Sequence, residues 1–259
     1  KGFVVCSVNA TEHSVMCAGT KDDEIGTFRT LMQTYPTGIL SVVSDTWDLW
    51  KVLTEYLPKL KEEVLSRDGK LVIRPDSGDP VDIICGESRE LGSNTPKDKG
   101  VVELLWDIFG GTVNEQGYKV LDAHIGAIYG DSITTERAEA ICQRLSEKGF
   151  ATTNVVLGIG SFTYQFNTRD TFGFAMKATS VVVNGERREI FKDPITDDGV
   201  KKSAKGLVKV ELQNGEYVLV DQVTPEEENT GELQVIYENG KFVNQVNIQE
   251  IRDHINSNL

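Results

Sequence analysis

Residues 71–80 read Leu71-Val72-Ile73-Arg74-Pro75-Asp76-Ser77-Gly78-Asp79-Pro80. An apolar run that turn residues follow is typical of a buried strand, and here an arginine and an acid come directly after it. In parallel α/β folds, ligands bind at the carboxyl ends of the strands. An arginine there can hold phosphate with a bidentate fork, and carboxylates can bind sugar hydroxyls or a metal ion. The alternative interpretation is a surface turn with a solvated ion pair.

The same pattern, an apolar strand followed by polar or glycine residues, recurs along the first part of the chain. Strands are predicted at 2–6, 38–43, 71–73, 123–129 and 154–157, with helices at 21–35, 47–60, 101–109 and 135–149 between them. In a parallel barrel the strand ends meet on one rim. The residues at these ends are His13, Asp45, Arg74, Asp76, Gly130, Asp131, Gly160 and Ser161. Such groups together suit a phosphorylated sugar with a metal ion.

Several of these residues have a second interpretation from the sequence. His13, just past a strand, is placed for catalysis or anion binding, or is a hydrogen-bonded loop histidine. Asp45 is either the cap of the next helix or an acid that supports the site. The turn at Gly160-Ser161 can bring backbone N–H groups to a phosphate, but any tight turn needs such residues. Arg169 either supplies a positive charge to this turn or forms an ion pair on the surface.

The texture of the sequence changes after residue 178. Asn-Gly turns at 184–185, 214–215 and 239–240 lie between strand-forming residues, which is a strong hairpin signal. Antiparallel strands are therefore predicted at 181–191 and 207–243, with a final helix at 248–255. We expect an α/β portion at 1–178 and a β-rich portion at 179–259. Lys192 and Lys201 flank a loop, where lysines are usually solvated but can help to hold a polyphosphate.

Composition limits the class of protein. The 259 residues carry a net charge of −13, which argues against a general nucleic-acid binder. Its four cysteines lack C-x-x-C spacing, so a reducing cytoplasm is expected. No apolar stretch approaches the roughly 20 residues that span a bilayer. Because the chain begins with Lys1 rather than Met, we expect a fragment, a processed chain or a trimmed one.

Five short motifs occur in an order that resembles one family. They are Thr11-Glu12-His13-Ser14, Ser41-Val42-Val43-Ser44-Asp45, Ile73-Arg74-Pro75-Asp76-Ser77-Gly78, Gly130-Asp131 and Phe191-Lys192-Asp193-Pro194. Together they resemble the bacterial and phage form of the nicotinamide phosphoribosyltransferase family, from about Ser7 to the end of the chain. The match covers about the C-terminal half of a family member. The other half carries part of the barrel and the groups that bind the base.

The resemblance implies a fold, a reaction and partners. The fold is the type II phosphoribosyltransferase kind, an irregular α/β barrel, here partial, with a β-rich C-terminal portion. The reaction joins nicotinamide to phosphoribosyl pyrophosphate and gives nicotinamide mononucleotide and pyrophosphate, a step of NAD biosynthesis. It uses Mg²⁺ and is coupled to ATP hydrolysis through a phosphorylated histidine. A homodimer with a shared active site is implied, with no nucleic acid or membrane as partner.

The resemblance also implies roles for residues. His13 would be the phosphorylated histidine, Asp45 would support the site, and Asp76 and Asp131 would hold the ribose hydroxyls. Catalysis is assigned to His13, Asp45 and Asp76, and no residue is assigned as a metal ligand. Substrate binding is assigned to Arg74, Pro75, Asp76, Gly130, Asp131, Gly160, Ser161, Arg169, Lys192 and Lys201. The family has more glycines after the strand than Gly160-Ser161-Phe162 offers, and the added side chains crowd the approach to phosphate.

Three alternatives stay open on the sequence. The base can be nicotinate, because the acid that reads the nicotinamide amide lies outside this sequence. The chain can be a truncated, non-catalytic fragment that binds sugar phosphates or pairs with a separate N-terminal half. It can also be another sugar-phosphate enzyme with a barrel fold.

Overall fold

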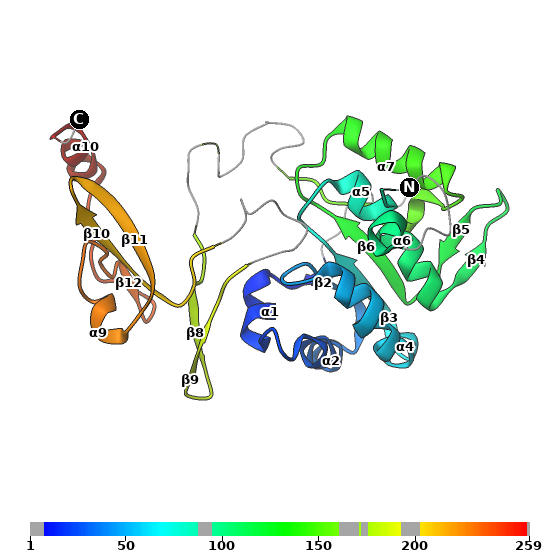
Figure 1. The fold of residues 1–259 in the computed structure, drawn as a ribbon, viewed down its shortest axis with the longest axis horizontal. Coiled ribbons are helices and arrows are strands. Elements are labelled where there is room, and N and C mark those ends of the chain that lie inside the picture. The colour runs from blue at the N-terminus through cyan, green and yellow to red at the C-terminus, as the bar shows by residue number, and fades with distance from the viewer. Residues whose placement is uncertain (1–7, 88–94, 161–170, 172–175, 193–202, 258–259) are drawn as a thin grey trace. The chain divides into compact units, whose positions relative to one another are not determined.

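A computed structural model describes residues 8–87, 95–160, 171, 176–192 and 203–257. Five parallel strands form one sheet in the order β1-β2-β3-β6-β7, of which Figure 1 labels β2, β3 and β6. They are β1 (Asn9–Ala10), β2 (Thr37–Val43), β3 (Asp68–Arg74), β6 (Ile125–Tyr129) and β7 (Val155–Leu157). Each strand pairs with the next parallel strand along the chain, as in an α/β barrel, whereas a doubly wound sheet reverses its order at a switch point. The predicted α/β class is confirmed, with the sheet as a section of a barrel.

Helices connect the parallel strands. They are α1 (His13–Gly19), α2 (Glu24–Thr34), α3 (Leu49–Lys51), a π-helical turn η1 (Val52–Tyr56), α4 (Leu57–Leu65), α5 (Pro80–Cys85), α6 (Pro96–Phe109), α7 (Thr135–Glu147) and a 3-10 turn η2 (Thr152–Asn154). The helix predicted at 101–109 therefore begins earlier, at Pro96, and α5 was not predicted. A short antiparallel hairpin, β4 (Gly111–Val113) with β5 (Lys119–Leu121), follows α6 and was not predicted.

The helix starts correct two sequence predictions and confirm a third. Asp48, not Asp45, caps the helix after β2, because its side chain accepts a hydrogen bond from the Lys51 N–H. Thr134 caps α7, whose first residue, Thr135, is the predicted start of that helix. His13 is the first residue of α1 and not a loop residue. Each difference is a shift of a few residues along the chain, which local capping rules do not resolve when several Asp, Ser or Thr residues are adjacent.

The core of this unit lies between the sheet and the connecting helices. Leu40, Leu71 and Ile73 from the strands pack in one cluster with Leu53, Leu57 and other apolar residues of the helices. The helix predicted at 47–60 corresponds to α3, η1 and the start of α4, which bury Trp50, Leu53, Leu57 and Leu60. One contact is unusually close: a Cβ on Gly100, whose φ is +76°, would lie 2.2 Å from the backbone nitrogen of Gly86, so this crossing of α5 and α6 requires glycine.

A second hairpin packs beside α1. It consists of β8 (Ser180–Val183) and β9 (Glu186–Glu189) around the predicted Asn-Gly turn. Ile190 and Phe191 lie with Cys17 and Trp47 in a small apolar cluster of their own. The sequence texture changes at residue 179, but the division into compact units falls between Ser203 and Ala204. The hairpin therefore belongs with the parallel sheet.

The second unit, residues 204–259, contains short elements. They are the hairpin β10 (Leu207–Gln213) with β11 (Glu216–Val223), α9 (Pro225–Glu228), the hairpin β12 (Tyr237–Glu238) with β13 (Lys241–Phe242), and α10 (Ile248–Ser257). The predicted hairpins and final helix are confirmed, and α9 interrupts the predicted strand region. Every residue from 208 to 257 is partly or fully exposed within the unit, so these two-stranded sheets have no core of their own. Among the described residues, no helix is long and apolar enough to span a membrane.

Candidate active site

The carboxyl ends of the parallel strands open into a cleft of about 660 Å³. His13 follows β1, Asp76 follows β3 and Asp131 follows β6, while Lys192 comes from the segment after β9. These four predicted site residues line the same cleft, together with Glu12, Ser14, Cys17, Met176, Lys177, Ala178, Ile190, Phe191 and Ser203. The sequence prediction that polar strand ends meet on one rim is confirmed for the first three.

His13 is held on both ring nitrogens. Its Nδ1 lies 2.9 Å from Oγ1 of Thr46, and its Nε2 lies 3.1 Å from Oδ1 of Asp76. The Lys192 ammonium lies 2.8 Å from the same Nε2 and donates to Asp76 Oδ1 at 2.7 Å. These contacts fix the ring at the start of α1 with Nε2 toward a cation and a carboxylate.

The Asp76 carboxylate is the negative centre of this group. Burial acts to raise its pKa, but the protonated form of the His13 ring and the Lys192 ammonium outweigh burial and hold the pKa well below its usual range. The folded protein therefore favours the ionised Asp76 carboxylate. An ionised carboxylate that is paired with an ammonium can exchange this internal partner for a charged or hydroxylated ligand, as a binding site requires.

Asp45 supports the β3 turn from within the protein. It is fully buried, and its Oδ2 accepts hydrogen bonds from the Asp76 backbone N–H at 3.0 Å and from the Ser77 hydroxyl. Its Oδ1 has no hydrogen-bond partner among the described residues and lies 3.8 Å from His13 Nε2. Burial, followed by the charge of Asp76, raises the pKa of Asp45. Of the two interpretations left by the sequence, the structure supports the acid behind the site.

Arg74 and Pro75 sit between the strands rather than on the cleft wall. The Arg74 guanidinium donates to the Thr11 carbonyl and lies 3.6 Å from the Glu12 carboxylate. Pro75 is buried. Arg74 thus ties the end of β3 to the end of β1, and its side chain retains 19% exposure from which it can reach an anion.

The ends of β6 and β7 approach each other closely. The Gly158 N–H donates to the Tyr129 carbonyl at 2.8 Å, and a Cβ on Gly158 would lie 2.7 Å from the Cα of Gly130. Gly130 and Gly160 are exposed, and beyond Gly160 and its chain neighbours no atom of the described residues lies within 4 Å of a Cβ built on Gly160. Three predicted binding residues, Ser161, Arg169 and Lys201, lie outside the described residues.

Apolar packing positions Lys192 over His13. The Phe191 ring packs edge-on against Trp47, with centroids 4.9 Å apart. The Cys17 thiol donates to the Phe191 carbonyl at 2.9 Å, and burial raises the pKa of that thiol to about 11, so it stays protonated. The lysine therefore emerges from an anchored residue and reaches a histidine that is 179 positions away in the sequence.

Thr46, Ser77 and Cys17 contribute to the site but were not predicted as site residues. Thr46 and Ser77 each follow a predicted acid directly, which is the one sequence signal that could have pointed to them. Their function depends on partners 33 and 32 residues away, His13 and Asp45.

His13, Asp45 and Asp76 place one ligand atom each within 4.8 Å of the others, which is a spacing compatible with a metal ion. The chemistry of this trio does not fit a resident Mg²⁺, which prefers oxygen ligands and retains water. The Lys192 ammonium already neutralises this position by contacting both His13 Nε2 and Asp76 Oδ1. Asp76 and Asp131, two of the carboxylates that line the open cleft, offer the oxygen ligands that Mg²⁺ prefers.

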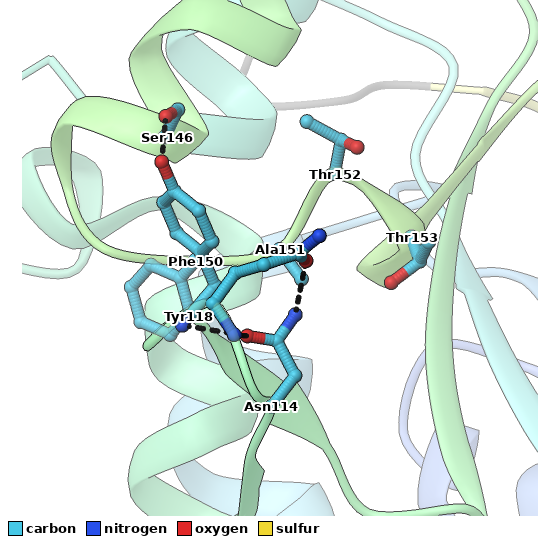
Figure 2. A pocket seen from close by; sticks show the side chains of 8 residues that line it. Asn114, Tyr118, Ser146, Phe150, Ala151, Thr152 and Thr153 are labelled. Carbon is cyan, nitrogen blue, oxygen red and sulfur yellow. Dashed lines mark hydrogen bonds between the residues drawn. The ribbon is translucent and has the colours of Figure 1, made fainter.

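A second cleft, of about 200 Å³, lies before the amino end of β7. Asn114, Gln116, Tyr118, Ser146, Phe150, Ala151, Thr152 and Thr153 line it. Figure 2 shows that its polar groups bond to one another: the Ser146 hydroxyl donates to the Tyr118 hydroxyl at 3.0 Å, and Asn114 Oδ1 accepts from the Tyr118 N–H at 2.9 Å. Since this cleft opens on the side of the sheet away from the strand-end rim, its contacts stabilise the fold.

Comparison with known proteins finds relatives along the whole chain. The model of the nicotinate phosphoribosyltransferase (NAPRTase) family matches residues 3–245. A protein from Acinetobacter baylyi named nicotinamide phosphoribosyltransferase is 54% identical over 265 residues, which cover 100% of this chain and 52% of that protein. Proteins of the same name from Mycoplasma pneumoniae and Xanthomonas campestris are 45% and 34% identical, over 76% and 96% of this chain and 43% and 51% of their own lengths.

The chain spans about half the length of the curated relatives it matches. The motifs that carry the resemblance, from Thr11-Glu12-His13 to Phe191-Lys192, fall inside the matched region. Four of the five motifs contribute residues to one cleft, and Asp45 of the fifth bonds the Asp76–Ser77 turn behind it. The resemblance is confirmed, and the chain belongs to the nicotinate phosphoribosyltransferase (NAPRTase) family.

Proposed function

We propose that this chain carries the phosphoribosyl site of an enzyme that joins nicotinamide to phosphoribosyl pyrophosphate and forms nicotinamide mononucleotide and pyrophosphate. One observation carries the proposal: three strand ends and Lys192 bring an imidazole, two carboxylates and an ammonium to one cleft. The name shared by the relatives supplies the base and the reaction. The step belongs to NAD biosynthesis, and its enzyme to the pentosyltransferases.

The chemistry needs groups of the kinds found here. Displacement at the anomeric carbon passes through an oxocarbenium-like transition state, so the enzyme must fix the ribose and neutralise the departing pyrophosphate. Asp76 and Asp131 would accept hydrogen bonds from the ribose hydroxyls. Lys192, which lines the cleft, and Arg74, at the end of β3, would move from their internal partners to phosphate oxygens. The open turn at Gly160 would bind the 5′-phosphate, together with Ser161 and Arg169.

Two further components are part of the proposal. Mg²⁺ would be held by the cleft carboxylates Asp76 and Asp131 with phosphate oxygens, and would neutralise charge on the pyrophosphate. ATP hydrolysis would be coupled through His13, whose Nε2 faces the cleft, with Lys192 and Lys201 toward the phosphates. Replacing His13 with Ala would then abolish ATP coupling and leave some transfer activity.

The enzyme would act in the cytoplasm as a homodimer whose two copies share the active site, without nucleic acid or membrane as partner. A second candidate, transfer to nicotinate, is favoured by the description of the matching family model. The relatives named nicotinamide phosphoribosyltransferase, one of them 54% identical to this chain, favour nicotinamide more strongly.

Mononucleotide formation tests the proposal. The chain is incubated with phosphoribosyl pyrophosphate and Mg²⁺, with nicotinamide or nicotinate, and with or without ATP. Nicotinamide mononucleotide above background establishes the reaction, and the comparison of bases separates the two candidates. No product with either base, together with no binding of phosphoribosyl pyrophosphate, overturns the proposal. Binding without product identifies a fragment that needs the other half of the enzyme.

A further inference from the structure

The hydrogen bonds of His13 determine which of its nitrogens carries the proton. A neutral imidazole has one N–H and one acceptor nitrogen, and the partners of the two nitrogens decide between them. Nδ1 faces the Thr46 hydroxyl at 2.9 Å, and Nε2 faces both the Lys192 ammonium at 2.8 Å and Asp76 Oδ1 at 3.1 Å. The hydroxyl can donate or accept, so Thr46 alone permits either tautomer.

Lys192 removes this ambiguity. An ammonium has only donors, so the nitrogen 2.8 Å from it must accept. A proton on Nε2, in either the neutral or the charged ring, would set two donors against each other. The short distance from Nε2 to Asp76 is therefore a contact between two acceptors that Lys192 bridges, because its Nζ also donates to Oδ1 at 2.7 Å. The proton is left on Nδ1, which donates it to Thr46 Oγ1.

We infer that Thr46 is a positioning residue that fixes the tautomer of His13, with the proton on Nδ1 and the free lone pair on Nε2. Thr46 is fully buried, directly after the buried Asp45, so its hydroxyl offers an acceptor at a fixed place. The lone pair on Nε2 then faces the cleft, where it can accept a proton or an electrophilic group without prior loss of a proton. The catalytic role of this tautomer rests on the proposed function.

The main test reads the tautomer directly. The chain contains three histidines, so long-range ¹H–¹⁵N spectra of the histidine-labelled full chain are simple, and the His13→Asn variant identifies the signals of His13. We expect the proton on Nδ1 in the unaltered chain and in Thr46→Ser. In Thr46→Val, which keeps the shape but removes the acceptor, we expect a mixture in which the Nε2–H tautomer is prominent. Thr34→Val, an exposed threonine in α2, is the control for the same chemical change.

A proton on Nε2 of His13 in the unaltered chain overturns the inference, as does a tautomer that Thr46→Val leaves unchanged. The rate of product formation is the second measurement. It should fall about tenfold in Thr46→Val, roughly the contribution of one hydrogen bond, and stay within about twofold in Thr46→Ser. An altered tautomer with unaltered turnover overturns the catalytic role. A chain with the expected tautomers but no turnover in any variant keeps Thr46 as the positioning residue and counts against the proposed function alone.

Discussion

Glu24 makes the stability of the chain depend on pH. This first residue of α2 is 2% exposed, and its Oε1 has no hydrogen-bond partner among the described residues. Burial, and after it the charge of Asp48, raises its pKa from 4.5 to about 8. Asp45 acts in the same direction, and Lys51 and Lys21 act against it. The folded protein therefore favours the protonated carboxyl.

The sign of the effect follows from linkage. An acid whose pKa is higher in the folded state loses its proton first in the unfolded chain, so the free energy of unfolding falls as pH rises from about 4.5 to about 8. At about 1.4 kcal/mol per pKa unit, the loss between pH 5 and pH 8 is ~3 kcal/mol. The Glu24→Gln variant keeps the shape, lacks the titrating proton and should not show this part of the pH dependence.

Urea unfolding, followed by tryptophan fluorescence, measures this difference. The three tryptophans, Trp47, Trp50 and Trp106, all lie in the unit that contains Glu24. The stability of the unaltered chain relative to Glu24→Gln should fall by ~3 kcal/mol between pH 5 and pH 8, while exposed Glu62→Gln should follow the unaltered chain. Equal pH dependence of Glu24→Gln and the unaltered chain, within about 0.5 kcal/mol, would refute the reasoning.

Three further substitutions probe the site and its support. Ser77→Ala removes a hydroxyl donor to the buried Asp45 carboxyl, and the free energy of unfolding should fall by about 2 kcal/mol in urea unfolding. Lys148→Met breaks a buried ion pair with Glu103, whose charged atoms are 2.7 Å apart, and should lower stability by about 3–5 kcal/mol in the same assay. Gly158→Ala places a Cβ 2.7 Å from the neighbouring strand end, and calorimetry should show weaker binding of phosphoribosyl pyrophosphate.

Matched variants separate these effects from general damage. Ser66→Ala removes an exposed hydroxyl that bonds only a nearby carbonyl and should cost less than about 0.5 kcal/mol. If Ser77→Ala behaves like it, the hydroxyl does not support Asp45. A change of less than about 1 kcal/mol in Lys148→Met would show that its ion pair is not structural. Unchanged binding in Gly158→Ala would show that the close approach of β6 and β7 does not shape the phosphate site.

The rim of the site could be predicted because each of its parts is local. An apolar run followed by Arg74-Pro75-Asp76, or by Gly130-Asp131, marks a strand end within a few residues. The parallel barrel places such ends together without any knowledge of side-chain contacts. Asp45 shows the limit of that reasoning: a local rule cannot tell a cap from an acid that binds the neighbouring turn, and here Asp48 is the cap.

Long-range contacts account for the parts that the sequence left open. Lys192 was predicted to face phosphates, but its contact with His13 spans 179 positions and depends on packing between Phe191 and Trp47. The tautomer of His13 depends on Thr46 and Lys192 together, and these two residues lie far apart in the sequence. The extent of the first unit, to Ser203, likewise follows from the packing of the β8–β9 hairpin on α1 and not from the change in texture at residue 179.

Binding of phosphoribosyl pyrophosphate to the full chain tests the central claim most directly. Titration calorimetry with Mg²⁺ should show saturable binding at one site per chain, weakened at least about tenfold by Lys192→Met and by Asp131→Asn. The exposed change Lys59→Met, far from the strand ends in α4, should leave the affinity unchanged. Absence of binding, or binding that neither cleft variant weakens, would contradict the assignment of this cleft as the phosphoribosyl site.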